Sequence, residues 1–138
     1  MEPHNLSLLI VDGKRGLMAT VLIIEDESMV LILAESVLQT AGHETLSAGL
    51  LPEAKAIIES DAKFDIVFTD IALDEEQDAG IAIGKLVENK RPGTPVLYTS
   101  ARALTDGLQV LLIERSAFLP KPYTDDHLNA ALAGLLKR

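Results

Sequence analysis

Polar side chains that could do chemistry follow four apolar runs of this chain. Glu25 and Asp26 follow VLII, Asp70 follows IVFT, Ser100 follows VLYT, and Lys121 follows AFLP. Short apolar runs of this kind are typical of strands buried on both faces of a parallel sheet. Open α/β sheets bind ligands at the edge where the carboxyl ends of their strands meet. We therefore expect three carboxylates, a hydroxyl and an ammonium to converge at one edge of such a sheet.

This combination of groups indicates metal-assisted phosphoryl chemistry. Clustered carboxylates repel one another unless a hard cation such as Mg²⁺, which prefers oxygen ligands, neutralises them. An ammonium beside them would suit an incoming phosphoryl group. The predicted cofactor is therefore Mg²⁺, held by the acidic residues, with Lys121 beside it.

The segments between the apolar runs predict helices that alternate with strands. Apolar residues recur at helical spacing over 28–40, after Pro52, over 79–88, over 104–112 and after Thr124, and a weaker strand is expected at 44–47. A βα unit repeated five times predicts an α/β fold of the flavodoxin-like, doubly wound (βα)5 type. Its parallel five-stranded sheet would have the order 2-1-3-4-5 and helices on both faces.

Two similar segments compete for the first strand of this sheet. LLIVDG, which ends at Gly13, imitates the later LIIEDE, but only the later segment is followed by a clear helix. We therefore place the domain at 18–138. Residues 1–17 are then an N-terminal extension of unknown structure.

The composition argues against several classes of protein. A net charge of −9 disfavours direct nucleic-acid binding, which needs clustered Lys and Arg. The absence of cysteine rules out disulfides and thiol catalysis, and no apolar run approaches the length of a membrane span. We expect a cytoplasmic protein with no membrane or nucleic-acid partner.

The strand-end residues, taken in chain order, resemble the receiver domain of bacterial two-component response regulators. The resemblance covers about Ala19 to Lys137. Its marks are the acidic pair after the first strand, Asp70 after the third, Ser100-Ala101 after the fourth, and Lys121-Pro122 after the fifth. Each mark alone is weak, and the four in order form a strong composite pattern.

The resemblance implies a metal site and a phosphoacceptor. Asp70 would be the nucleophile that accepts a phosphoryl group from a histidine kinase or phosphotransfer protein, forming an aspartyl phosphate. Glu25, Asp26, Asp70 and the backbone carbonyl of Ala72 would hold one Mg²⁺. Such a domain phosphorylates itself from a phosphodonor and is not an independent turnover enzyme.

The resemblance also implies the groups that bind and report the phosphoryl group. Lys121, whose bond to Pro122 the family holds cis, would pair with one phosphoryl oxygen, and Ser100 would hydrogen-bond another. Ser100 and Phe118 would form the switch that changes the surface offered to a downstream protein. The face made by the fourth helix, fifth strand and fifth helix would also serve to pair two copies of the chain. Arg102, two residues past Ser100, could reach over the site and affect the lifetime of the phosphoryl group.

Two alternatives stay open, and one departure from the family pattern favours the first of them. After Leu73 the chain has an acidic run from Asp74 to Asp78, where the family commonly has proline after an apolar residue. A receiver-like interaction module that works without phosphorylation is one alternative. A phosphate sink that drains a kinase is the other.

Overall fold

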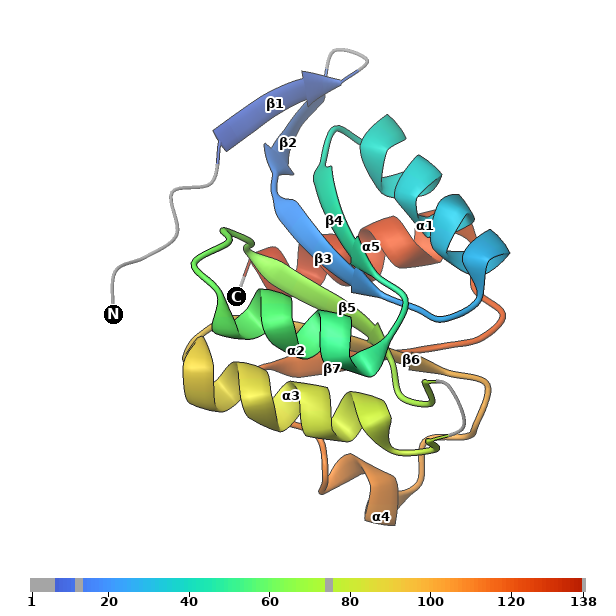
Figure 1. Ribbon diagram of the computed structural model, residues 1–138. Helices are drawn as coiled ribbons and strands as arrows, with labels where there is room; N and C mark the ends of the chain where they lie inside the picture. Colours follow the sequence, from blue (N-terminus) through green and yellow to red (C-terminus); the bar gives the residue numbers. More distant parts are fainter. Residues whose placement is uncertain (1–6, 12–13, 74–75, 138) are drawn as a thin grey trace.

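The chain folds around a five-stranded sheet, as seen in a computed structural model that describes residues 7–11, 14–73 and 76–137 (Figure 1). The strands of this sheet are β3 (Thr20–Ile24), β4 (Glu44–Ala48), β5 (Ile66–Asp70), β6 (Val96–Ser100) and β7 (Ser116–Pro120). The helices are α1 (Ser28–Thr40), α2 (Leu51–Glu59), α3 (Ala79–Lys90), α4 (Asp106–Gln109) and α5 (Asp125–Leu136). Over the described ranges, no helix is both long and apolar enough to cross a bilayer.

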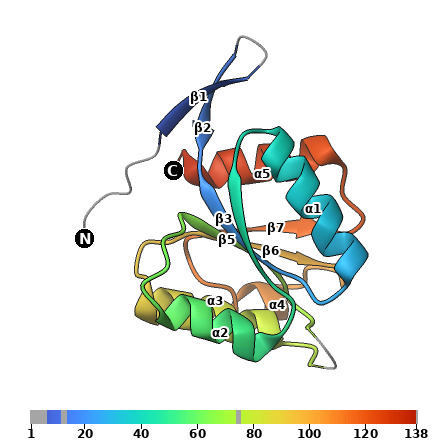
Figure 2. The same cartoon turned by 45° about the horizontal axis from the view of Figure 1, so that its top comes forward.

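The sheet has the predicted order. Its strands lie in the sequence β4-β3-β5-β6-β7, and every neighbouring pair is parallel. Numbered within this sheet alone, the order is 2-1-3-4-5, which confirms the flavodoxin-like fold. Helices cover both faces, with α1 and α5 on one side and α2 and α3 on the other (Figure 2).

Alternating residues of each strand supply the two halves of the core. Leu22 and Ile24 of β3 pack with α2 and α3, whereas Val21 and Ile23 pack with α1 and α5. Successive side chains on a strand point to opposite faces, so a strand covered by helices on both sides must be apolar throughout. This is why β3, β5 and β6 contain continuous apolar runs, each followed by a polar residue, whereas the edge strand β4, with the sequence ETLSA, is only partly buried.

Backbone hydrogen bonds fix the strand ends relative to one another. The amide of Ile71, just past β5, donates to the carbonyl of Thr99 on β6 at 2.9 Å. The amide of Lys121, just past β7, donates to the carbonyl of Ser100 at 2.9 Å. The residues that follow β5 and β7 are therefore both held against β6 by the ladder.

The fourth helix is much shorter than predicted. The sequence indicated a helix over 104–112, but α4 spans only Asp106–Gln109. Beyond it, the amide of Leu111 donates to Leu108 and that of Leu112 to Gln109, a three-residue spacing that tightens the chain into turns. The leucines have helical spacing, but Leu111 is exposed and Leu112 only half-buried. Burial therefore gives little support to a longer helix.

Two apolar residues expected on inward helix faces lie outside. The apolar spacing expected over 28–40 and 79–88 includes Leu33 on α1 and Ala82 on α3, yet Leu33 is 60% exposed and Ala82 is also exposed. On α1 the burial belongs to Ala34 and Leu38. The buried stripe of each helix is thus narrower than the apolar periodicity suggests, which leaves apolar surface on α1.

The first two strands of the chain form a ribbon separate from the five-stranded sheet. β1 (Ser7–Val11) and β2 (Lys14–Met18) pair antiparallel as a two-stranded sheet, from Ser7 opposite Met18 to Val11 opposite Lys14. Only Ala19 separates β2 from β3. The sequence had assigned no structure to this segment, and the domain boundary at residue 18 stays a prediction.

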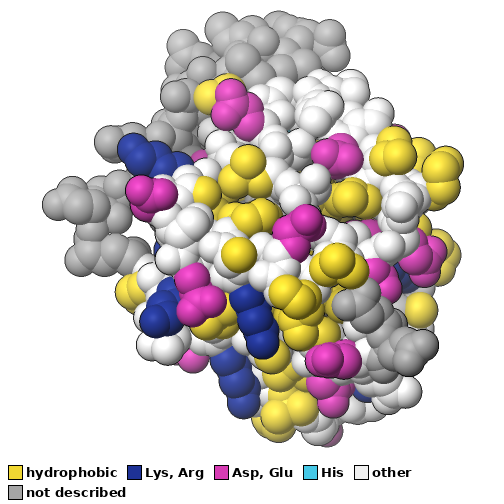
Figure 3. All heavy atoms as spheres, viewed as in Figure 1, with side chains coloured by type: hydrophobic (Ala, Val, Ile, Leu, Met, Phe, Trp, Pro, Cys, Tyr) yellow, Lys and Arg dark blue, Asp and Glu magenta, His cyan; other side chains and the backbone are white. Residues whose placement is uncertain are grey.

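Acidic side chains are dispersed over the one face of the molecule that Figure 3 shows. On the face seen in Figure 3, Asp and Glu side chains are interspersed with basic and hydrophobic ones. With a net charge of −9, two copies of this body repel one another at long range.

A glycine on α3 allows the helix to approach the site, and its replacement should be costly. A Cβ on Gly80 would overlap the Asp70 carbonyl oxygen and lie 2.6 Å from the Ile71 Cα, both backbone atoms that cannot rotate away. We expect Gly80→Ala to lower the free energy of unfolding by roughly 1–3 kcal/mol. Urea denaturation measures this change.

Gly134 provides the matched control for this substitution. It lies on α5, where a Cβ would meet nothing within 4 Å, so Gly134→Ala should stabilise by about 0.4–1 kcal/mol. Equal effects of the two substitutions would show that α3 does not pack as tightly on the end of β5 as described.

Candidate functional site

Three carboxylates meet at the carboxyl edge of the sheet, as the sequence predicted. Glu25 and Asp26 follow β3, and Asp70 ends the neighbouring strand β5. One carboxylate oxygen from each of the three lies within 4.8 Å of the others. Glu25 and Asp70 are buried and Asp26 is partly exposed. The cluster is thus anchored in the protein and opens to solvent at Asp26.

Lys121 bridges two of these carboxylates. Its ammonium donates hydrogen bonds to Asp70 Oδ2 at 2.7 Å and to Glu25 Oε1 at 2.8 Å. The Lys121–Pro122 peptide bond is cis, as the family resemblance implied. One cation therefore links the ends of β3, β5 and β7, and β6 lies between β5 and β7.

Backbone amides orient the remaining carboxylate oxygens. The amide of Ala72 donates to Asp70 Oδ1 at 3.1 Å, and that of Glu27 donates to Glu25 Oε2 at 3.2 Å. Glu25 and Asp70 are thereby each held between a backbone amide and the Lys121 ammonium. The observed contact of Ala72 is made by its backbone amide. The role of its backbone carbonyl as a metal ligand stays a prediction.

Burial and pairing act in opposite directions on the ionisable groups. Burial raises the pKa of Glu25, and the hydrogen bonds from Lys121 and the Glu27 amide only partly offset it. Burial alone would lower the pKa of Lys121, but its bonds to Asp70 and Glu25 prevail and raise it. A raised pKa means that protonated Glu25 stabilises the folded state. This contribution is complete below the ordinary glutamate pKa and disappears as the pH rises through the raised pKa. Lys121 stays charged until strongly alkaline pH.

Ser100 lies at the same edge, and Phe118 lies on the neighbouring strand β7. Ser100 is buried, and its hydroxyl oxygen accepts a hydrogen bond from the Arg102 amide at 2.9 Å. Phe118 on β7 is half-buried, stands opposite Tyr98 of β6 in register, and packs against the core under α2 and α3. The two predicted switch residues are therefore on neighbouring strands, with Phe118 already partly inside.

Two further contacts near the site were not predicted. The Arg102 guanidinium does not cover the carboxylates: it pairs with Asp78, at the start of α3, at 3.0 Å. Tyr123 packs edge to face on Phe68 at 5.9 Å, and burial raises the pKa of its phenol. The short distance from Lys121 along the chain was the only signal for Tyr123, and nothing in the sequence pointed to the pairing of Arg102 with Asp78.

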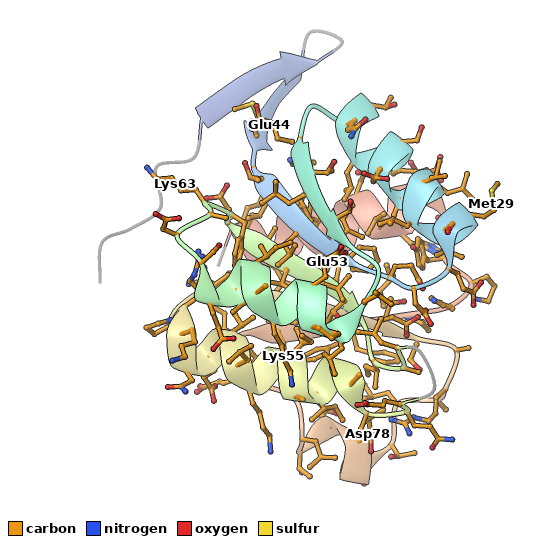
Figure 4. The ribbon with its side chains drawn as sticks, in the orientation of Figure 1. Met29, Glu44, Glu53, Lys55, Lys63 and Asp78 are labelled. Carbon is orange, nitrogen blue, oxygen red and sulfur yellow. The ribbon has the colours of Figure 1, made fainter. Side chains whose placement is uncertain are left out.

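An apolar groove adjoins the carboxylate cluster. It has a volume of about 430 Å³ and runs between α1 and the segment after β7, with Val30, Leu33 and Tyr123 among its lining residues and Lys121 at its margin. Beside it, α1 exposes Met29 and Ile32 as well, and Met29 projects from the start of the helix in Figure 4. The charged cluster therefore lies next to an exposed apolar surface on α1, made by Met29, Ile32 and Leu33.

Comparison with known proteins identifies the family. The sequence pattern of the family described as "Response regulator receiver domain" matches residues 21–133. A search of curated proteins found no match.

Solved structures with the same fold include several receiver proteins. A response regulator receiver protein from Sinorhizobium medicae WSM419 is 28% identical, with a TM-score of 0.79 over 87% of this chain and 95% of that one. A CheY-like receiver domain from Methanospirillum hungatei JF-1 is 21% identical, with a TM-score of 0.76 over 87% and 94%. The response regulator TrrA from Thermotoga maritima, solved in complex with Mg²⁺ and BeF, is 20% identical, with a TM-score of 0.73 over 86% and 99%.

The geometry of the site agrees with this assignment. A cluster such as Glu25, Asp26 and Asp70 is typical of the Mg²⁺ site of receivers and consistent with a phosphoacceptor site. Members of this family act in two-component signalling with histidine kinases and are not turnover enzymes. The match spans most of the chain, and this protein belongs to the response regulator receiver domain family.

Proposed function

We propose that this chain accepts a phosphoryl group on Asp70 from a histidine kinase or phosphotransfer protein and then changes its binding to a downstream protein. The observation that carries the proposal is the Lys121 ammonium, which lies 2.7 Å from Asp70 at an edge shared with two further carboxylates. Phosphoryl transfer to Asp70 requires an oriented carboxylate and a nearby cation that can offset the negative charge of the phosphoryl oxygens. Asp70 and Lys121 provide these two groups.

The donor set fits a magnesium ion. Three carboxylates within ligand reach of one another offer only oxygen atoms, which Mg²⁺ prefers, and the partly exposed Asp26 leaves room for the water ligands that Mg²⁺ usually keeps. Glu25, Asp26, Asp70 and the carbonyl of Ala72 would hold the ion. When bound, Mg²⁺ would supply positive charge that offsets the charge of the phosphoryl oxygens.

The residues of the chain then have separate tasks in the transfer. An oxygen of Asp70 forms a bond to phosphorus while the bond from phosphorus to the donor's histidine nitrogen breaks, and the nitrogen keeps the electron pair. Lys121 turns from the carboxylates toward a phosphoryl oxygen. Ser100, whose oxygen already accepts from the Arg102 amide, has its hydroxyl proton available to donate to another phosphoryl oxygen.

Movement of Ser100 toward the phosphoryl group would carry the signal outward. The added charge draws the loops after β6 and β7 inward, since Ser100 and Lys121 stand on them and their backbones are joined. Phe118, half-buried on the neighbouring strand β7, would move further into the space that Ser100 leaves. This changes the packing of the face formed by α4, β7 and α5, which would bind the downstream partner or a second copy.

The exposed apolar surface of α1 beside the site would bind the protein that donates the phosphoryl group. Met29, Ile32 and Leu33 are each more than half exposed on α1, next to the groove that reaches Lys121. A helix carrying the donor histidine would cover these side chains and bring its nitrogen to Asp70. Their exposure in the isolated chain is then explained by burial in the transient complex.

Incubation with Mg²⁺ and acetyl phosphate should add one phosphoryl group to the chain. The expected reading is a single additional phosphoryl mass in the intact protein, which disappears in Asp70→Asn and is lost when Mg²⁺ is chelated. Asp61→Asn, a matched substitution at an exposed residue, should label like the parent. Parent protein that stays unlabelled would favour the interaction module that works without phosphorylation.

Magnesium should bind with an affinity that falls on acidification. Asp26→Asn removes one ligand charge and should weaken Mg²⁺ binding on the order of tenfold or more in calorimetry, with Asp61→Asn unaffected. Because the pKa of Glu25 is raised, affinity should decline as the pH drops through that raised value, at higher pH than an ordinary glutamate would cause. Unchanged binding by Asp26→Asn would remove this residue from the metal site.

The switch can be followed with beryllofluoride, which stands in for the phosphoryl group. Amide NMR signals over residues 102–123 should shift when it binds in the presence of Mg²⁺, and the shifts should be much smaller in Ser100→Ala. Changes confined to the neighbours of Asp70 would contradict the coupling through Ser100 and Phe118. That outcome, with labelling intact, would support the phosphate sink instead.

A further inference from the structure

The N-terminal ribbon, made of β1 and β2, has only two strands, fewer than a sheet needs to be stable by itself. β1 and β2 pair only as a two-stranded sheet, and both views show it projecting from the end of the main sheet (Figures 1 and 2). It precedes the start of β3, whereas the carboxylate cluster follows the end of β3, so the ribbon and the site lie at opposite ends. An isolated two-stranded ribbon is at best marginally stable in water, and three or more strands are needed for independent stability.

One edge of this ribbon is open and unprotected. Within the ranges that the structure describes, β2 lies on one side of β1 and no strand lies on the other. β1 has the sequence SLLIV, with no charge, proline or glycine. Soluble proteins usually guard such an edge with those residues, because its unpaired backbone groups are a template for another strand.

The other strand of the ribbon carries the protection that β1 lacks. β2 has the sequence KRGLM, with two consecutive cations and a glycine. Lysine on an edge disfavours strand pairing, and glycine weakens a strand. The difference in charge singles out the β1 edge for an added strand.

We propose that this edge pairs with the same edge of a second copy of the chain. Two β1 strands would align antiparallel across a twofold axis and form a four-stranded sheet in the order β2-β1-β1-β2. An antiparallel strand edge is complementary to itself, as a twofold interface requires. Each β1 has a single open edge, so the assembly closes at two chains.

The charge distribution favours this second copy over contact through the main body. Two bodies with a net charge of −9 each repel one another, while β1 itself is uncharged. Pairing at the projecting ribbon joins the chains through backbone hydrogen bonds and apolar residues and holds the acidic bodies apart. The interface is independent of phosphorylation, since it lies away from Asp70.

Sedimentation velocity of the full chain without Mg²⁺ or phosphodonor tests the proposal. The parent should sediment with twice the mass of 14.9 kDa. Leu9 is the central residue of β1, so Leu9→Lys or Leu9→Glu would place like charges opposite each other and weaken the dimer on the order of tenfold or more. Mixing the two variants should restore dimers, since opposite charges then meet across the axis.

Two controls separate this interface from loss of folding and from another surface. The thermal unfolding of the Leu9 variants should match that of the parent at concentrations where all are monomeric. Leu111→Lys, on the exposed segment after α4, should leave the dimer unchanged. A monomeric parent, assemblies larger than a dimer, dissociation by Leu111→Lys, or failure of the mixed Leu9 variants to pair would each overturn the proposal.

Discussion

One ammonium between two buried carboxylates is the interaction on which the site depends. Lys121 reaches Asp70 and Glu25 at 2.7 and 2.8 Å, and neither carboxylate side chain is more than 10% exposed. Removing one partner of a buried ion pair typically costs about 3–5 kcal/mol, because the other charge is left without compensation. The apoprotein therefore needs Lys121 to hold its acidic edge together. Under the proposed function, a metal ion or a phosphoryl group changes the charge that Lys121 balances, and the lysine side chain must then find a new partner.

The sheet connects the groups around Lys121 to one another through its backbone hydrogen bonds. Parallel strands bring their carboxyl ends to one edge, and the ladder ties the residue after β5 to β6 and the residue after β7 to Ser100. The close approach of Gly80 to the backbone at Asp70 adds α3 to the same framework. Four elements, β5, β6, β7 and α3, thus meet close to Asp70. A displacement of Ser100 or Lys121 has to be accommodated by the packing of the neighbouring strands, where Phe118 of β7 is half-buried.

The sheet order could be predicted from the alternation of strands and helices along the chain, and the carboxylate cluster from a separate physical rule. A strand covered on both faces must be apolar, so the first polar residue after it marks the functional edge, as at Asp70 and Lys121. The length of α4 could not be obtained this way, since Leu111 and Leu112 keep helical spacing while burial of the turn decides its conformation. The exposure of Leu33 could not be predicted, because the spacing of apolar residues does not show how much of the helix surface the neighbouring elements cover. The Arg102–Asp78 pair joins side chains from separate loops, for which the sequence carries no spacing signal.

The proposed function requires Asp70 to be the residue that carries the phosphoryl group. Borohydride reduction tests this most directly, because it converts an aspartyl phosphate to homoserine and leaves a free carboxylate unchanged. After incubation with Mg²⁺ and acetyl phosphate, reduction and peptide mass spectrometry should find homoserine at position 70 and aspartate at position 26. Homoserine at another position, or aspartate retained at position 70 in protein that had taken up phosphoryl label, would contradict it.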